Sequence, residues 1–237
     1  MKFASISIAA LALALAGAAS AQTTNSTQID VTHVTSVLND NVQNVTGAVS
    51  NTSAAIGNSL SETATSASTL NNFQASAAGV NAYLNSTVQV VNGAVSNTAA
   101  AIGNSLSVEA AGEDLNLSNN QFFRGDAIST LNGHVEDVQG EVALTSAAIA
   151  NSESYDVQAT DWANITNYQT TNIDPRAYSN VGVSDVTGNV SNTKAAISKS
   201  LSVSTLPQTA DIRLNPTQLT KHYNGAHDTS TTSAVAG

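Results

Sequence analysis

The chain of 237 residues contains no cysteine, and aromatic and charged side chains are both scarce. No disulfide can therefore hold the fold together, even in an oxidising compartment. Aromatic residues make up 4% of the chain and charged residues 10%, where about a quarter is usual for charged residues. A thick globular core needs large side chains. The excess of Ala, Ser, Thr, Asn, Val and Gly instead favours a thin interior in which backbones approach closely.

Basic residues are also few. The chain has 7 Lys and Arg against 17 Asp and Glu, which gives a formal net charge of −10. Such a chain is repelled by nucleic acid and by anionic membrane surfaces, so neither is expected as a partner. No apolar run reaches the roughly 20 residues that a membrane-spanning helix needs, and we therefore expect no transmembrane segment.

Residues 1–21 have the features of a signal peptide. Lys2 supplies a positive charge, Ile8 to Ala16 form a short apolar run, and Ala19-Ser-Ala21 is a small-x-small cleavage site. Cleavage there leaves Gln22 as the mature N-terminus, and no cysteine follows it that would carry a lipid anchor. The sequence predicts an exported protein, either extracellular or on the outer cell surface, with the periplasm as a further location.

A motif that occurs four times organises the rest of the chain. Its second copy reads Val91-Asn-Gly-Ala-Val-Ser-Asn-Thr-Ala-Ala-Ala-Ile-Gly-Asn-Ser-Leu-Ser-Val108. The four repeat cores are residues 45–61, 91–108, 138–155 and 186–203. The glycines at the third position of the cores are 46, 47 and 48 residues apart, and they are Gly47, Gly93, Gly140 and Gly188. A nearly fixed period of this length is typical of a solenoid, a propeller or an array.

Alternation within each core predicts β-strands. A first strand would cover residues 91–95, Asn97-Thr98 would interrupt it, and a second strand would follow. One face of that second strand would carry Ala100, Ile102, Asn104, Leu106 and Val108. A helix would instead place apolar residues three and four positions apart. We predict an all-β fold, a repeat β-solenoid of four repeats of about 47 residues, in which each repeat makes one coil or two.

Stacking the repeats predicts columns of like side chains. The asparagines of the first three cores would form a hydrogen-bonded amide ladder, and they are Asn58, Asn104 and Asn151. The isoleucines two residues earlier would stack beside them as an apolar column, and they are Ile56, Ile102, Ile149 and Ile197. Lys194 and Lys199 interrupt the fourth copy, which is typical of a terminal repeat that blocks further strand addition. The repeated glycines would lie at bulges or at points of close backbone approach.

The remaining segments set the expected boundaries of the repeat domain. Residues 22–28 are polar without periodicity, which predicts a flexible leader. The β-repeat domain would then cover residues 29–206, and residues 207–237 would form a polar C-terminal tail.

Most of the large side chains lie between the second, third and fourth cores, and some of them are candidates for a ligand surface. Phe122, Phe123, Trp162 and Tyr168 would form an aromatic platform for sugar rings, or they would plug the ends of a thin core. The tripeptide Arg124-Gly-Asp126 beside them is of the kind that integrins recognise.

No constellation of residues indicates catalysis, so we expect neither catalytic residues nor a cofactor. Alternate oxygen ligands at Asp114, Asn116, Ser118 and Asn120 resemble the start of a calcium loop. The glycine at the sixth position and the glutamate at the twelfth are missing, which argues against a calcium site. Acidic residues near Arg176 share no motif, and they are Asp156, Asp161 and Asp174.

The signal peptide and the repeated Ala-Ile-Gly-Asn-Ser-Leu-Ser cores resemble bacterial exported repeat proteins rich in Ala, Asn, Ser and Gly. Within that group the chain most resembles the alphaproteobacterial holdfast-attachment proteins, and more distantly the curli-type fibre subunits. The resemblance implies a secreted, cell-surface structural or adhesive protein, such as an adhesin, a holdfast anchor or a fibre subunit. Its partners would be itself, other proteins of the surface matrix or polysaccharide. The alternative is a secreted carbohydrate-binding or carbohydrate-active β-helix.

Overall fold

A computed structural model describes residues 22–111, 114–158, 162–205, 211–220 and 229–236, so the expected signal peptide lies outside the described residues. The described residues are all-β, in strands joined by short turns. The strands are β1 (Gln22–Asp30), β2 (Val34–Val45), β3 (Val49–Ala64), β4 (Ser68–Ser76), β5 (Val80–Val91), β6 (Val95–Ala110), β7 (Asp114–Phe123), β8 (Ala127–Val138), β9 (Val142–Val157), β10 (Trp162–Thr171), β11 (Arg176–Val186), β12 (Val190–Thr205), β13 (Asp211–Thr220) and β14 (Thr229–Ala236).

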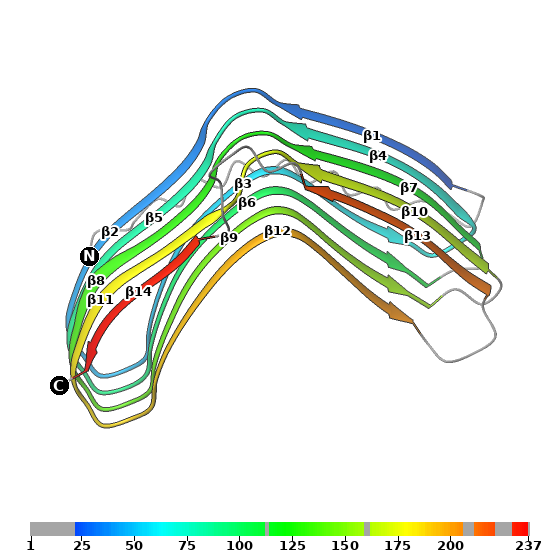
Figure 1. Ribbon diagram of the computed structural model, residues 1–237. Coiled ribbons are helices and arrows are strands. Elements are labelled where there is room, and N and C mark those ends of the chain that lie inside the picture. The colour runs from blue at the N-terminus through cyan, green and yellow to red at the C-terminus, as the bar shows by residue number, and fades with distance from the viewer. Residues whose placement is uncertain (1–21, 112–113, 159–161, 206–210, 221–228, 237) are drawn as a thin grey trace.

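The strands stack into three parallel sheets, as the β-solenoid prediction requires. Sheet A has the order β1-β4-β7-β10-β13, sheet B has β14-β11-β8-β5-β2, and sheet C has β12-β9-β6-β3. One coil therefore contributes one strand to each sheet, and successive coils lie directly on one another (Figure 1). The described part of the chain forms four such coils, and β13 and β14 continue sheets A and B beyond them.

Each period of the sequence makes a single coil. Val49 pairs with Val95, and Val95 pairs with Val142, which are steps of 46 and 47 residues. The last full step, from Val142 to Val190, is 48 residues. The alternative of two shorter coils per repeat is therefore wrong.

The cross-section of the solenoid is bent. Sheets A and B lie over the two halves of the longer sheet C, whose strands curve at their middle (Figure 1). One core cluster joins sheet B to the first half of sheet C through residues such as Leu84 and Val95. A second joins sheet A to the other half through residues such as Leu117 and Leu106. The bend itself is filled mostly by alanine, with Phe123 as its one large member.

Both ends of the repeat region extend further than the sequence suggested. Residues 22–28 lie in β1, which pairs in register with β4 from Gln22 to Asp30, so they are part of sheet A rather than a flexible leader. Within the expected polar tail, β13 pairs with β10 and β14 with β11. Pro216 lies in β13, which is one of the two edge strands of sheet A in the described part of the chain, and a missing N–H donor is tolerated in an edge strand.

The expected alternation within the cores fails at one residue in each coil. Asn97-Thr98 does not interrupt β6, and residues 92–94 form a turn rather than a strand. Gly103 and Asn104 are both buried although they are consecutive, so the inward and outward faces exchange there. Ile102 therefore stacks in register with Ile56 and Ile149, but on the outer face of sheet C and not beside the asparagines. The pairing stays one to one across this point, since Ile56 pairs with Ile102 and Asn58 with Asn104, so no strand carries an extra residue. The exchange of faces coincides with the bend of sheet C (Figure 1).

A second irregularity recurs where sheet B ends. Asn44, Val90, Asp137 and Asp185 all have positive φ angles, between 52° and 57°. Asn and Asp adopt this left-handed conformation readily, whereas a β-branched residue is strained in it. Val90 is 47% exposed and so gains little from burial.

Replacement of Val90 by asparagine should therefore stabilise the protein. We expect Val90→Asn to raise the free energy of unfolding by about 1 kcal/mol, because it relieves the left-handed strain. Urea denaturation of the mature chain measures the change. Asn44→Val, at the same corner of the first coil, is the reciprocal variant and should be destabilising by a similar amount. If both variants match the parent, the corner relaxes and stores no strain.

Candidate functional site

The aromatic side chains predicted for a ligand surface divide between the outer face of sheet A and the core. The Phe122 ring on β7 contacts the Tyr168 ring on β10, with centroids 5.4 Å apart and ring planes tilted by 47°. Phe73 on β4, which the sequence analysis did not single out, lies on the other side of Phe122 at 5.5 Å. The three half-buried rings form a continuous row across three coils, which we call the aromatic row.

The other two predicted aromatic residues lie elsewhere. Phe123 is fully buried in the bend, as expected for a side chain that plugs the core. It packs where Gly103 has no side chain, since a Cβ on Gly103 would collide with its ring. Trp162 is 41% exposed but lies six residues before Tyr168 on β10. At about 3.3 Å per residue this places it about 20 Å from the aromatic row.

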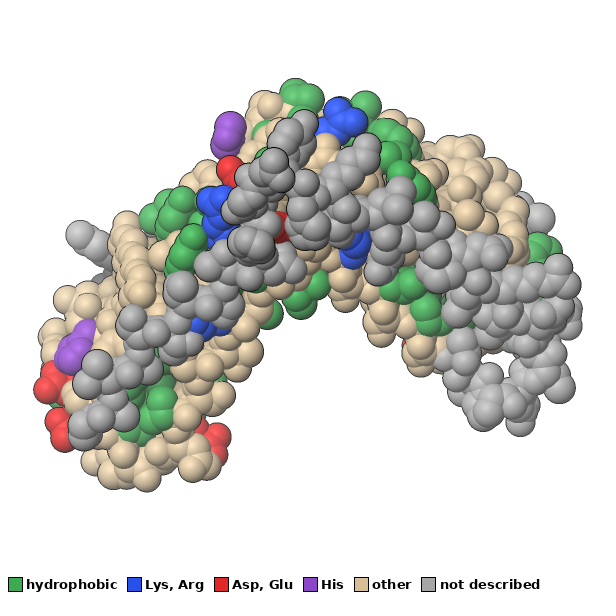
Figure 2. Space-filling view, in the orientation of Figure 1, with side chains coloured by type: hydrophobic (Ala, Val, Ile, Leu, Met, Phe, Trp, Pro, Cys, Tyr) green, Lys and Arg blue, Asp and Glu red, His purple; other side chains and the backbone are tan. Residues whose placement is uncertain are grey.

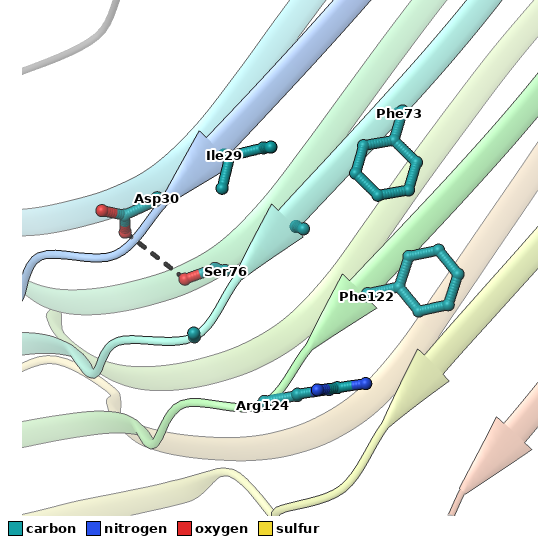
Figure 3. A pocket seen from close by; sticks show the side chains of 8 residues that line it. Ile29, Asp30, Phe73, Ser76, Phe122 and Arg124 are labelled. Carbon is teal, nitrogen blue, oxygen red and sulfur yellow. Dashed lines mark hydrogen bonds between the residues drawn. The ribbon is translucent and has the colours of Figure 1, made fainter.

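A hollow of about 330 Å³ opens beside the aromatic row. Its lining is Ile29, Asp30, Phe73, Ala75, Ser76, Ala77, Phe122 and Arg124. Ile29, Ala75 and Phe122 occupy one register column on neighbouring strands, so the small Ala75 lies between two large side chains. The hollow exists because the first and third coils place a large side chain in this column, whereas the second coil places only the methyl group of Ala75 there (Figure 3).

Two charged residues border the hollow, but only Arg124 is on the outer face of sheet A. The Asp30 side chain points inward, where a Cβ on Gly57 of sheet C would lie 3.3 Å from its Oδ2. The Asp30 carboxylate accepts hydrogen bonds from the Ser76 hydroxyl at 3.3 Å and from the Thr32 amide at 3.0 Å. Arg124 is exposed, and its side chain extends beside the Phe122 ring (Figure 3). The tripeptide that begins at Arg124 forms the corner between β7 and β8, where the Asp126 carbonyl accepts a hydrogen bond from the Val80 amide at 2.7 Å.

The predicted asparagine ladder lies directly behind the hollow. Asn58 Nδ2 donates to Asn104 Oδ1 at 2.8 Å, and Asn104 Nδ2 donates to Asn151 Oδ1 at 2.8 Å. Each amide also donates at 3.0 Å to a backbone carbonyl of sheet A, namely those of Ala75, Phe122 and Thr170. The ladder is thus confirmed for all three asparagines, and it ties sheet C to the strands that carry the site.

A second ladder, which the sequence analysis missed, runs in the opposite direction. Gln74, Gln121 and Gln169 each donate to the glutamine of the preceding coil, at 2.8 to 3.1 Å. The same amides donate to the backbone carbonyls of Ser105, Ser152 and Ser200 in sheet C. Together the two ladders bind sheets A and C to each other from both sides. The glutamine spacing follows the glycine period, which is the signal that reveals this ladder in the sequence.

The repeated glycines lie above one another in the turns between sheets B and C, and we call them the glycine column: Gly47, Gly93, Gly140 and Gly188. Successive turns approach each other closely along this column. A Cβ on Gly93 would lie 2.6 Å from the Gly47 carbonyl oxygen, and Gly140 and Gly188 meet the turn before them in the same way. A Cβ on Gly47 would meet nothing within 4 Å, because no coil precedes it in the described chain. The prediction of close approach is confirmed for the last three glycines of the column and not for Gly47.

This difference gives a matched pair of variants. We expect Gly93→Ala to lower the free energy of unfolding by about 2 to 3 kcal/mol, because the new methyl group collides with backbone that cannot move alone. Gly47→Ala introduces the same methyl group into open space and should change it by no more than about 0.5 kcal/mol. Thermal and urea denaturation measure both. Equal effects would show that the turn and not the collision determines the cost.

A buried carboxyl group interrupts one of the leucine columns. Glu153 is 1% exposed and pairs in register with Leu106 and Leu201. It accepts hydrogen bonds from the Tyr155 hydroxyl at 2.8 Å and from the Asn119 amide. Burial raises the pKa of Glu153 to about 8, since these hydrogen bonds offset the loss of water only in part. Burial and the adjacent Glu153 raise the pKa of Tyr155 in turn.

The residues considered for calcium are spread along a strand. Asp114, Asn116, Ser118 and Asn120 occupy alternate outward positions of β7 and therefore extend over about 20 Å. They do not converge on a single ion as the ligands of a calcium loop do. Among the described residues, no group of three or more His, Cys, Asp or Glu is placed to hold a metal ion.

The described residues also contain no helix that is long and apolar enough to cross a membrane.

Comparison with known proteins gives one match. The family model HfaD, described as holdfast attachment protein D, matches residues 88–218, which is more than half of the chain and extends from the end of β5 to β13. Neither the curated proteins nor the solved structures gave a match.

Proposed function

Because the chain belongs to the HfaD family of holdfast attachment proteins and is therefore a surface protein related to adhesion, we propose that it is exported and acts as a structural and adhesive repeat protein outside the cell. The match over residues 88–218 is the observation that carries this proposal. The signal-peptide features of residues 1–21 support export, and the net charge of −10 argues against nucleic acid as a partner.

The architecture fits a structural role. Stacked parallel strands, buried amide ladders and three core clusters make a stiff body, and polar side chains cover much of its surface (Figure 2). Such a body holds surface features at fixed positions along the solenoid axis. The aromatic row and its hollow are presented in this way on sheet A.

We also propose a role without catalysis. Asp156 lies near the end of β9 in sheet C, whereas Asp174 lies in the turn between β10 and β11 beside the bend. Asp161 lies outside the described residues. The separation of Asp156 and Asp174 supports the proposal, because acid–base catalysis needs its groups within hydrogen-bonding reach of one substrate.

Surface labelling and attachment assays test the proposed function. Antibody against the mature chain should stain intact cells, and cells without the gene should attach to a solid surface less than the parent. A gene that lacks codons 2–21 should restore neither the staining nor the attachment. If the protein is found only inside the cell, or if its loss leaves attachment unchanged, the proposal is wrong.

The lysines of the fourth coil give a prediction about assembly. Both lysines lie in β12, which is an edge strand of sheet C in the described chain. Lys194 pairs with Ser146 of β9, and Lys199 pairs with Asn151 of the same strand. Burial of either ammonium group against another copy would be costly without a matching carboxylate. Lys194→Ala combined with Lys199→Asn should therefore increase self-association, with the apparent mass rising with concentration in sedimentation. If the variant stays as monomeric as the parent, the lysines do not limit growth at this end.

A further inference from the structure

We propose that the hollow on sheet A is a binding site for a neutral glycan whose sugars are linked through equatorial positions. One sugar ring would occupy the hollow over Ala75, and its neighbours in the glycan would lie along the aromatic row. The inference deepens the proposed adhesive function and rests on it, because it names the chemistry of the ligand that this surface would hold.

The size and walls of the hollow fit one sugar ring. Its volume of about 330 Å³ lies at the lower end of the range for small-molecule sites. Ala75 forms the floor, while Ile29 and Phe122 rise on either side in the same register column. Phe73 closes the hollow along the strand direction (Figure 3). Apolar walls on three sides suit the C–H faces of a sugar and leave its hydroxyl groups at the edge.

Stacking on the aromatic row selects the kind of glycan. The face of an aromatic ring carries partial negative charge, and it attracts the weakly positive C–H groups of a sugar face. An equatorially linked chain is flat and presents such faces repeatedly, whereas an axially linked chain curves away. The row of Phe73, Phe122 and Tyr168 continues over three coils and so offers more than one stacking position.

The rim of the hollow supplies a partner for sugar hydroxyls. Hydroxyl groups accept hydrogen bonds, so they pair well with a guanidinium. The exposed Arg124 borders the hollow and donates to such hydroxyls, whereas the Asp30 carboxylate faces sheet C, where Ser76 and Thr32 hold it. The negative charge of the whole chain disfavours acidic glycans. The net charge therefore favours a neutral ligand over an acidic one.

The site is fixed before any ligand arrives. The Asn58 and Asn104 amides donate to the backbone carbonyls of Ala75 and Phe122, the floor and one wall of the hollow. The strands that carry the site are therefore tied to sheet C from behind. Binding to a preorganised site loses little conformational entropy, which increases affinity.

Calorimetric titration of the mature chain with cellohexaose, a β-1,4-linked glucose hexamer, tests the proposal. We expect saturable binding, with a dissociation constant that rises at least about tenfold in Phe122→Ala, where stacking is lost. Ala75→Leu fills the hollow without removing any contact of the fold, and it should weaken binding to a similar degree. Trp162→Ala removes an exposed aromatic residue from the same face of sheet A, outside the site, and should bind like the parent.

Circular dichroism and melting temperature must match the parent for each variant that is compared. Absence of cellohexaose binding overturns the proposal. It is also overturned if Phe122→Ala and Ala75→Leu both bind like the parent, or if axially linked maltohexaose binds as tightly as cellohexaose. These outcomes leave surface labelling and attachment untouched, so they do not decide the proposed function. A chain that binds cellohexaose but is absent from the cell surface would instead overturn the proposed function alone.

Discussion

Asn104→Leu is expected to lower the free energy of unfolding by about 3 to 4 kcal/mol. Asn104 is fully buried, and its amide accepts one hydrogen bond and donates two. Leucine has nearly the same size but can make none of these bonds. The Asn58 amide and the Asn151 oxygen then each lose a partner in the interior, and so does the Phe122 carbonyl. Each such loss costs about 1 kcal/mol or more.

The exposed asparagine ladder on sheet B provides the matched control. Asn85 donates to Asn39 at 2.8 Å and accepts from Asn132 at 3.0 Å, which is the same ladder geometry as that of Asn104. Water can replace these bonds because Asn85 is exposed, so Asn85→Leu should cost no more than about 0.5 kcal/mol. Urea denaturation of both variants measures the difference. If the two variants lose similar amounts of unfolding free energy, burial does not determine how much an asparagine ladder contributes to stability.

The stability of the protein is expected to fall by about 3 to 5 kcal/mol between pH 4.5 and pH 8 because of Glu153. The pKa of Glu153 is about 8 in the folded chain and about 4.5 when unfolded. As pH rises through this window, the unfolded chain releases the proton while the folded chain retains it. Deprotonation therefore favours unfolding, and the contribution of the group is fully present below pH 4.5 and lost near pH 8.

Glu153→Gln isolates this contribution. Glutamine keeps the shape of the protonated side chain and still accepts hydrogen bonds, but it does not titrate. The variant should show a much flatter dependence of unfolding free energy on pH between 4.5 and 8, and it should be more stable than the parent at pH 8. Urea denaturation at several pH values measures both curves. If the two curves stay parallel, Glu153 has an ordinary pKa in the folded chain.

The features that repeat without change were predictable from the sequence. The glycine period predicted the stacking of coils, because a Cβ at Gly93 cannot fit against the preceding turn. The asparagines predicted the buried ladder, because side chains in register meet at every coil. These predictions needed only the period and the knowledge that parallel strands stack.

The bend was not predictable by the same means. A strict alternation from Ala100 to Val108 continues through Gly103 in the sequence, whereas the strand exchanges its inward and outward faces there. The outward position of Ile102 follows from that exchange. Alternation predicts which residues share a face only as long as the strand stays regular. No feature of the sequence marks the point at which the two faces exchange.

The candidate site was predictable in part. Phe122 and Tyr168 were recognised because large side chains are rare in this chain, and the structure brings them together. Phe73 was missed because it lies in another coil and two register positions away from Phe122. Ala75 carries no signal of its own, since a hollow depends on the neighbours of a small residue and not on the residue itself.

Successive coils become longer by one residue, and the position of the added residue indicates where the chain tolerates a change in length. Ala64 pairs with Ala110, 46 residues later, but Ser68 pairs with Leu115, 47 residues later. The extra residue therefore lies at the corner between sheet C and sheet A. The next coil adds its residue at the same corner: Val157 follows its partner Ala110 by 47 residues, and Trp162 follows its partner Asp114 by 48. Additional residues at this corner leave all three sheets in register. It is the natural position for inserted tags or natural length variants, since the spacing between paired residues does not change across the other two corners of the full coils.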